Sequence, residues 1–207
     1  MHYTTKLDNN VKEIALHCPP VIIKVNEFTE ASADEVATLV ARAQNTGQDV
    51  LPVVIDSYGG QVYSLLSMIA SLRTSKIPVA TIVTGKAMSC GAILFSCGAE
   101  GMRFVDPDAT VMIHDVSSGM YGKVEELEAD VEEAKRLNKK IYKILARNCG
   151  KKDSYFQKIM DKKNHVDWFL EADECVKHNL ANHVRVPEFR VNVKVEMEFD
   201  YDEECDE

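Results

Sequence analysis

The sequence lacks a hydrophobic run long enough to cross a membrane, and its N-terminus lacks an apolar signal region. The longest apolar stretch, residues 87–99, is rich in Gly, Ser and Cys and is too short for ~30 Å of hydrocarbon. The first residues, MHYTTKLDNNVKE, are mostly polar and match no export signal. We therefore expect a cytoplasmic protein with no membrane contact.

Positive charge is also scarce, since 24 Lys and Arg face 33 Asp and Glu for a net charge of −9. An acidic chain without a basic stripe repels phosphate, which argues against nucleic acid as a partner. The six cysteines form no CxxC pair, so we expect free thiols and no zinc site. The phosphate-binding motif GxxxxGK[ST] is absent as well, so this chain should not use ATP itself.

The 207 residues, 45% of them hydrophobic, suffice for one folded domain. Apolar and β-branched runs predict strands at residues 21–25, 49–56, 79–85 and 109–114. Helical spacing predicts helices at 32–46 and 62–72 and a buried helix within 87–99. This alternation predicts an α/β fold with a largely parallel sheet.

A long amphipathic helix is predicted over residues 123–147. Its apolar stripe consists of Leu127, Val131, Ala134, Leu137, Ile141 and Leu145. A helix of ~25 residues is long for a domain of this size. It either projects toward another chain or packs along its own core, and the sequence leaves both arrangements open.

The two ends of the chain differ from its centre. Residues 1–10 are polar and are expected to be flexible. Residues 189–199 alternate strictly between apolar and polar side chains, which predicts a strand with one wet face. We therefore divide the chain into a main domain at 1–187 and a C-terminal strand with an acidic tail at 188–207. That strand is expected to pack against a neighbouring subunit.

Three local features suggest chemistry. Ser89 lies at a predicted strand-to-helix junction, where its hydroxyl would be exposed but would need a base to become nucleophilic. His114 ends a predicted strand, and histidine is the usual base near neutral pH. Gly59 and Gly60 follow another strand and allow close backbone approach to a ligand. Taken singly, each also fits a purely structural role.

Together with their flanks, these residues resemble the Clp protease proteolytic subunit family. The similar segments are, in order, IDSYGGQVYSLLSMIASL, IPVATIVTGKAMSCGAILFSCGAEGMRFVDPDATVMIHDVSSGMYG and HVDWFLEADECVKHNLANHV. The intervals match too, with 30 residues from Gly59 to Ser89 and 25 from Ser89 to His114. The resemblance extends from about Val21 to Val186.

The resemblance implies a ClpP/crotonase-like fold, in which repeated ββα units form a superhelix with a protruding handle at about 117–147. It implies a serine endopeptidase that cleaves unfolded or extended polypeptides inside an oligomeric chamber, built as a heptameric ring or a double ring. No metal or organic cofactor is required. An ATPase unfoldase as a partner is left open, because the N-terminal segment lacks the family's hydrophobic axial-loop pattern.

The resemblance also implies roles for individual residues. Ser89 is the nucleophile, His114 the general base and Asp167 the third member of the triad, while Asp115 is the competitor for that third place. The oxyanion hole consists of the backbone N–H groups of Gly60 and Cys90. The expected substrate contacts are Gly59, Gly60, Gln61, Val62, Ser118, Gly119 and Met120.

Departures from the family pattern indicate a divergent member. The family's Asn-Ser-Pro-Gly-Gly is Asp-Ser-Tyr-Gly-Gly at residues 56–60, and Val166 replaces an arginine of the inter-ring contact. The alternatives are a phage-type capsid-maturation protease of the same fold and a non-catalytic assembly subunit. A crotonase-type acyl-CoA enzyme and a Ser–Lys peptidase, with Lys86 as its base, are further alternatives.

Overall fold

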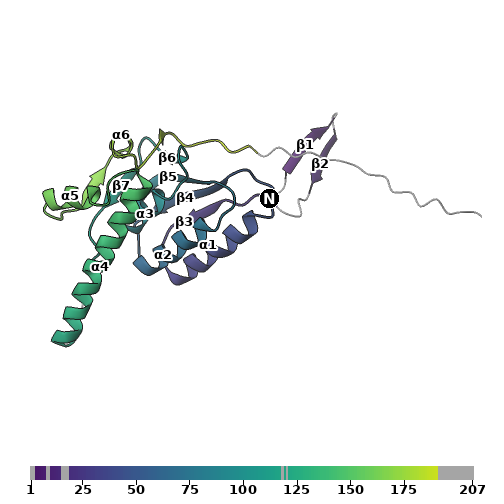
Figure 1. Cartoon of the computed structure of the whole chain (residues 1–207). Coiled ribbons are helices and arrows are strands. Elements are labelled where there is room, and N and C mark those ends of the chain that lie inside the picture. Colours follow the sequence, from purple (N-terminus) through teal and green to yellow (C-terminus); the bar gives the residue numbers. More distant parts are fainter. Residues whose placement is uncertain (1–2, 8–9, 15–18, 118, 120, 191–207) are drawn as a thin grey trace, which may run out of the picture.

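The computed structural model of the chain describes residues 3–7, 10–14, 19–117, 119 and 121–190. It shows an α/β fold with a mostly parallel sheet and several helices (Figure 1). The predicted alternation of strands and helices is therefore confirmed. Ser118 and Met120 lie outside the described residues, as does the expected C-terminal strand beyond Arg190.

The main sheet has seven strands. Every pair of neighbouring strands is parallel except β7 with β8, which is antiparallel. The strand order is β3-β4-β5-β6-β9, and β7 pairs with both β5 and β8. The strands are β3 (Ile23–Val25), β4 (Leu51–Ser57), β5 (Val79–Met88), β6 (Arg103–Val105), β7 (Thr110–Ile113), β8 (Trp168–Leu170) and β9 (His183–Val184). Buried Val, Ile and Leu side chains dominate β3, β4 and β5, as expected for strands covered on both faces.

The long strand β5 has two successive partners on one side. Its residues 81–83 pair with β6, and its residues 86–88 pair with β7. Because β5 and β7 run parallel, the residues that follow them emerge at the same edge of the sheet. Ser89 follows β5 and His114 follows β7, so the topology places these two side chains near each other.

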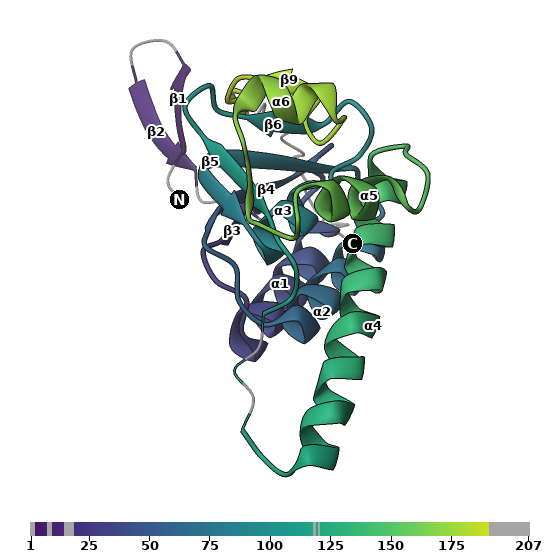
Figure 2. The same cartoon turned by 90° about the vertical axis from the view of Figure 1, so that its left-hand side faces the viewer.

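Three helices pack close to the sheet. They are α1 (Glu30–Ala43), α2 (Val62–Arg73) and α3 (Cys90–Phe95), and α1 lies alongside α2 (Figures 1 and 2). Every residue of α3 is buried. The buried helix expected within 87–99 is thus shorter than predicted, because Ala87 and Met88 still belong to β5.

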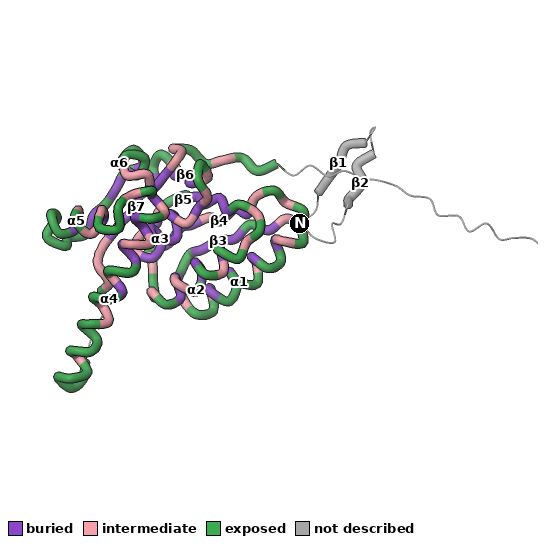
Figure 3. The backbone as a smooth tube through the Cα atoms, viewed as in Figure 1, coloured by how far each residue is buried: buried purple, intermediate pink, exposed green. Residues whose placement is uncertain are grey.

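Helix α4 (Val124–Asn148) confirms the predicted long helix and extends away from the body of the molecule (Figure 2). Its buried residues all lie in the second half: Leu137, Ile141, Tyr142, Leu145 and Ala146. The first half is exposed except where it is half-buried at Leu127, Glu133 and Ala134 (Figure 3). Within the described residues, no helix combines the length and the apolar character that crossing a membrane requires.

The chain after α4 returns to the sheet through α5 (Tyr155–Lys162), β8 and α6 (Ala172–Lys177). Strand β8 pairs antiparallel with β7, and Trp168 is opposite Ile113. Extending this register by one residue brings Asp167, just before β8, opposite His114, just after β7. The pairing of two short strands thereby joins parts of the sequence more than fifty residues apart.

The N-terminal segment contains two strands that the sequence pattern did not predict, and the flexibility expected for residues 1–10 stays a prediction. Strands β1 (Tyr3–Leu7) and β2 (Asn10–Ile14) form a separate antiparallel pair (Figure 1). Tyr, Thr, Val and Ile favour strands, and all four occur in these two segments. The polar composition concealed this local strand propensity.

Candidate active site

Ser89 occupies a sharp turn between β5 and α3. Its backbone has φ 56° and ψ −118°, a conformation that is uncommon for a residue with a side chain. The Ser89 N–H donates to the Met112 carbonyl of β7 at 2.8 Å, which fixes the turn against the neighbouring strand. Such strained residues persist where the surrounding structure determines them, and they cluster at active sites.

Gly59 and Gly60 pass directly beside this turn. Their φ angles are +108° and +152°, and a Cβ on Gly59 would lie 2.7 Å from the Ser89 Cβ. A Cβ on Gly60 would lie 2.7 Å from the Phe28 carbonyl oxygen. Both positions therefore require glycine for space as well as for conformation. The result is a backbone segment in close contact with Ser89.

Cys90 links the glycine segment to α3. Its thiol donates to the Gly60 carbonyl oxygen at 3.3 Å, and burial raises the pKa of this thiol. The protonated thiol is a poor nucleophile, so Cys90 does not compete with its neighbour Ser89. As the first residue of α3, Cys90 has a backbone N–H with no intrahelical acceptor.

A pocket lies in front of Ser89. Its lining residues are Gly60, Val62, Leu65, Ser89, Cys90, Ile93, Ile113, His114, Asp115, Val116, Ser117 and Ile141. Six of these are Val, Leu or Ile side chains, and they come from α2, α3, β7, α4 and the segment after β7. Apolar walls with a few polar groups are the usual composition of a ligand pocket.

Only some of the expected substrate contacts line the pocket. Gly60 and Val62 line the pocket. The backbone N–H of Gln61 donates to the Phe28 carbonyl, and its side chain accepts from Ser64, so Gln61 has structural partners. Gly119 is exposed and is not among the residues that line the pocket.

His114 and Asp167 lie next to each other, as the strand register requires. The distance from His114 Nδ1 to Asp167 Oδ1 is 3.8 Å, and the side chains are 21% and 52% exposed. Ser89 and His114 line the same pocket. The structure therefore brings Ser89 and His114 to one pocket and places Asp167 beside His114.

Asp115, the competitor of Asp167, has other partners. Its Oδ1 accepts from the Tyr142 hydroxyl at 2.5 Å, and its Oδ2 lies 2.8 Å from Nδ1 of His165. Both carboxylate oxygens are thereby occupied by residues other than His114. This arrangement favours Asp167 as the neighbour that orients His114.

Lys86, the base of the Ser–Lys alternative, is also occupied. Its Nζ lies 2.7 Å from Asp56 Oδ1 and 4.4 Å from the centre of the Tyr58 ring. The hydrogen bond to Asp56 raises the pKa of Lys86, whereas a lysine base needs a lowered pKa. Asp56 and Tyr58, the two departures from the family's glycine-turn sequence, thus hold Lys86 as a charged residue.

Sequence reasoning missed several residues around the pocket. Ile141 and Tyr142 of α4 were predicted only as parts of a helix, and His165 received no role. Their positions depend on the packing of α4 and of the chain after α5, which no local pattern encodes. In the described parts of the chain, no group of three His, Cys, Asp or Glu residues is arranged to hold a metal ion.

Comparisons with known proteins agree with this architecture. The family model described as Clp protease matches residues 12–188. The chain is also similar to ATP-dependent Clp protease proteolytic subunit 1 of Rhodopirellula baltica, with 30% identity over 164 residues. That match covers 78% of this chain and 70% of the relative. The family model and the relative both show that the chain belongs to the Clp protease family.

Proposed function

We propose that this chain is a serine endopeptidase with Ser89 as nucleophile, His114 as general base and Asp167 as the residue that orients His114. The observation that carries the proposal is the turn at Ser89. In a chain of the Clp protease family, a serine with φ 56° faces a pocket that His114 also lines. The strand register adds Asp167 at 3.8 Å from His114.

In the proposed reaction, Ser89 Oγ attacks the carbonyl carbon of the peptide bond while His114 accepts the hydroxyl proton. The tetrahedral oxyanion accepts hydrogen bonds from the backbone N–H groups of Gly60 and Cys90. The C–N bond then breaks, and His114 returns the proton to the leaving amine. Water, activated by His114, hydrolyses the acyl ester and regenerates Ser89.

The proposed substrate is an unfolded or extended polypeptide. The segment from Ser117 to Gly122 resembles the strand that pairs with substrate in the family. An extended chain would pair there and at Gly59 and Gly60, which gives affinity with little side-chain selectivity. The pocket walls formed by Val62, Leu65, Ile93, Ile113 and Ile141 suit an apolar side chain beside the cleaved bond. Peptides with Leu or Met there should be cleaved faster than peptides with Asp.

We also propose the family's finer architecture, a ClpP/crotonase-like superhelix assembled into a heptameric ring or double ring around a chamber. The exposed first half of α4 supports assembly, because Val124 and Val131 expose 65% and 43% of their surface. Val131→Glu should lower the mass measured by light scattering, and Asp130→Asn is the matched control. The relative's name specifies ATP dependence, and any use of ATP by this chain would require a separate ATPase as partner.

The direct test of the proposed function is hydrolysis of a fluorogenic peptide by Ser89→Ala. Removing a serine nucleophile lowers turnover by about 10⁴- to 10⁶-fold. Ser96→Ala is the matched control, since the Ser96 hydroxyl donates to the Ile93 carbonyl within the same part of the chain. Turnover by Ser89→Ala equal to that of the wild type would refute the proposal.

A further inference from the structure

We infer that His165 is a positioning residue for this site. Together with Asp115, it holds the segment that carries Asp167 against the strand end that carries His114. This inference rests on the proposed function, because it concerns the alignment of His114 with Asp167. It assigns a role to two side chains that the peptidase reaction itself does not use.

The first observation is the backbone between α5 and β8. Asn164 and His165 have φ angles of 54° and 59°, so two consecutive residues adopt the left-handed conformation. The His165 N–H donates to the Met160 carbonyl at 3.0 Å, which turns the chain back after α5. A histidine in this conformation requires support from its surroundings, and Asp167 lies two residues further along.

The second observation is the side-chain contact that supplies this support. His165 Nδ1 lies 2.8 Å from Asp115 Oδ2. Asp115 directly follows His114, so this hydrogen bond spans the same gap as the 3.8 Å approach of His114 to Asp167. Of these two contacts between the strand end and the incoming segment, the His165 contact is the shorter one.

The third observation is a connection to α4. The other oxygen of Asp115 accepts from the Tyr142 hydroxyl at 2.5 Å, and the Tyr142 side chain is fully buried. Burial, together with the Asp115 hydrogen bond, raises the pKa of Tyr142, so its hydroxyl remains a donor. Asp115 is therefore fixed from inside the fold and serves as a rigid acceptor for His165.

Asp161 completes the surroundings of His165. Its Oδ1 lies 3.7 Å from His165 Nε2, so the imidazole stands between a carboxylate of α5 and the carboxylate that follows β7. The His165 side chain is 51% exposed and that of Asp115 28%. Exposed ion pairs contribute little to stability. Loss of this contact should therefore change the alignment of the site far more than the stability of the fold.

The test measures kcat and KM for a short fluorogenic peptide with the full chain. His165→Ala removes the hydrogen bond to Asp115 and should lower kcat about tenfold, below the ~10² expected for a 1 Å misplacement. KM should remain unchanged, because the pocket walls are intact. His165→Asn should restore most of kcat, since its amide nitrogen can occupy the Nδ1 position and donate to Asp115.

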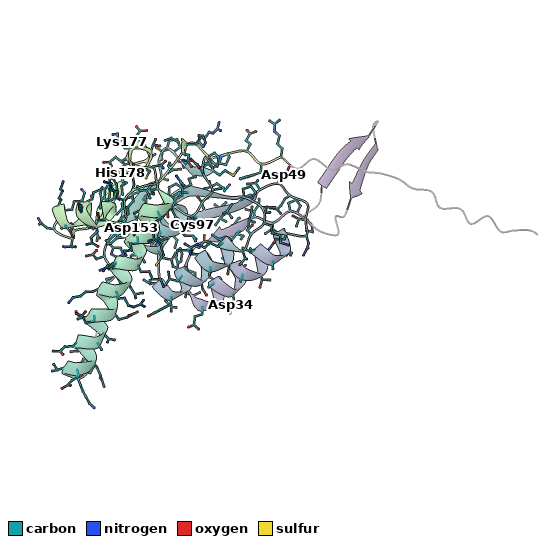
Figure 4. All side chains as sticks on the ribbon, viewed as in Figure 1. Asp34, Asp49, Cys97, Asp153, Lys177 and His178 are labelled. Carbon is teal, nitrogen blue, oxygen red and sulfur yellow. The ribbon has the colours of Figure 1, made fainter. Side chains whose placement is uncertain are left out.

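Asp153→Ala is the matched control, because it breaks a comparable ion pair between Asp153 and Arg147 near the body end of α4 (Figure 4). Its kcat should equal that of the wild type. Thermal unfolding of each variant verifies the fold. If His165→Ala does not fold, the comparison of His165→Asn with His165→Gln decides, since the longer Gln side chain places its amide beyond the Nδ1 position.

The inference would be overturned if His165→Ala had the kcat of the wild type. It would also be overturned if His165→Asn lost as much kcat as His165→Ala. In the fallback comparison, equal kcat values for the Asn and Gln variants would overturn it. Failure of the proposed function itself has a different signature, because Ser89→Ala would then retain activity. An inactive Ser89→Ala combined with a fully active His165→Ala rejects only the positioning role.

Discussion

The two sides of the pocket are built in different ways. On the side of the proposed nucleophile, called the nucleophile side, Ser89 has a positive φ, and the contacts at Gly59 and Gly60 leave no room for a Cβ. On the base side, His114 and Asp167 approach only to 3.8 Å, and Asp167 is half exposed. The geometry of the nucleophile side is set within two neighbouring strand-to-helix turns. The geometry of the base side depends on the pairing of β7 with β8, which are distant in the sequence.

This difference indicates how substitutions on each side of the pocket should affect activity. We call the nucleophile side the rigid side, because a Cβ added at Gly59 would lie only 2.7 Å from the Ser89 Cβ. The base side is held by side chains such as His165 and Asp115, whose contacts can lengthen without a steric clash. Substitutions on the rigid side should therefore act through clashes, and those on the base side through alignment.

Apart from the loss of Ser89 itself, the largest effect is expected on the base side. Asp167→Asn should lower kcat by up to ~10⁴, because an amide in place of the carboxylate favours the wrong imidazole tautomer. Circular dichroism should show an unchanged fold, since Asp167 is half exposed. Full activity in Asp167→Asn would transfer the orienting role to another residue, with Asp115→Asn as the next variant to measure.

A smaller but still large effect is expected on the rigid side. Gly59→Ala would place a Cβ 2.7 Å from the Ser89 Cβ at a φ of +108°. The turn must then shift, and kcat should fall by about 10²- to 10³-fold, as when an oxyanion-hole donor is lost. Gly47→Ala is the control, since Gly47 also has a positive φ but has open space around it. Equal activity of the two variants would contradict the close packing at Ser89.

Lys86 distinguishes the two candidate bases. In the proposed mechanism Lys86→Met lowers kcat by no more than about fivefold, because Lys86 contacts Asp56 and the Tyr58 ring and takes no part in the reaction. His114→Ala, in contrast, should be almost inactive. The opposite outcome, an inactive Lys86→Met with an active His114→Ala, would establish a Ser–Lys mechanism.

The smallest effect concerns Cys90. Burial raises the pKa of its thiol, and only the thiolate reacts with iodoacetamide. Near neutral pH the native enzyme should therefore keep its activity during alkylation, and peptide mapping should find Cys90 unmodified. Reactivity should appear only as the pH rises above the usual range for a thiol. Rapid inactivation at pH 7 with label on Cys90 would show that this side is more open than proposed.

Much of this architecture could be predicted from local sequence. Continuous apolar runs predicted β4 and β5, and helical spacing predicted α2 and α4, because these patterns depend only on neighbouring residues. The turns at Gly59 and Ser89 were also predictable, since both lie where a strand gives way to a helix. The predicted stripe of α4 was correct as a pattern, but only its second half is buried.

The remaining features depend on contacts that the sequence does not display. Strands β8 and β9 have three and two residues, too few for a period to be recognised. The pairing of His165 with Asp115 joins residues fifty positions apart, and no spacing in the sequence indicates that these two residues meet. The strands at the N-terminus were missed because polar composition was weighted above strand propensity.

The most direct measurement of the central claim is covalent labelling with a fluorophosphonate, followed by peptide mapping by mass spectrometry. The reagent reacts with a serine whose proton is accepted by a neighbouring base. The account predicts a single modified residue, Ser89, with labelling lost in Ser89→Ala and strongly slowed in His114→Ala. Modification of another serine, or equal labelling of Ser89 in the wild type and in His114→Ala, would contradict it.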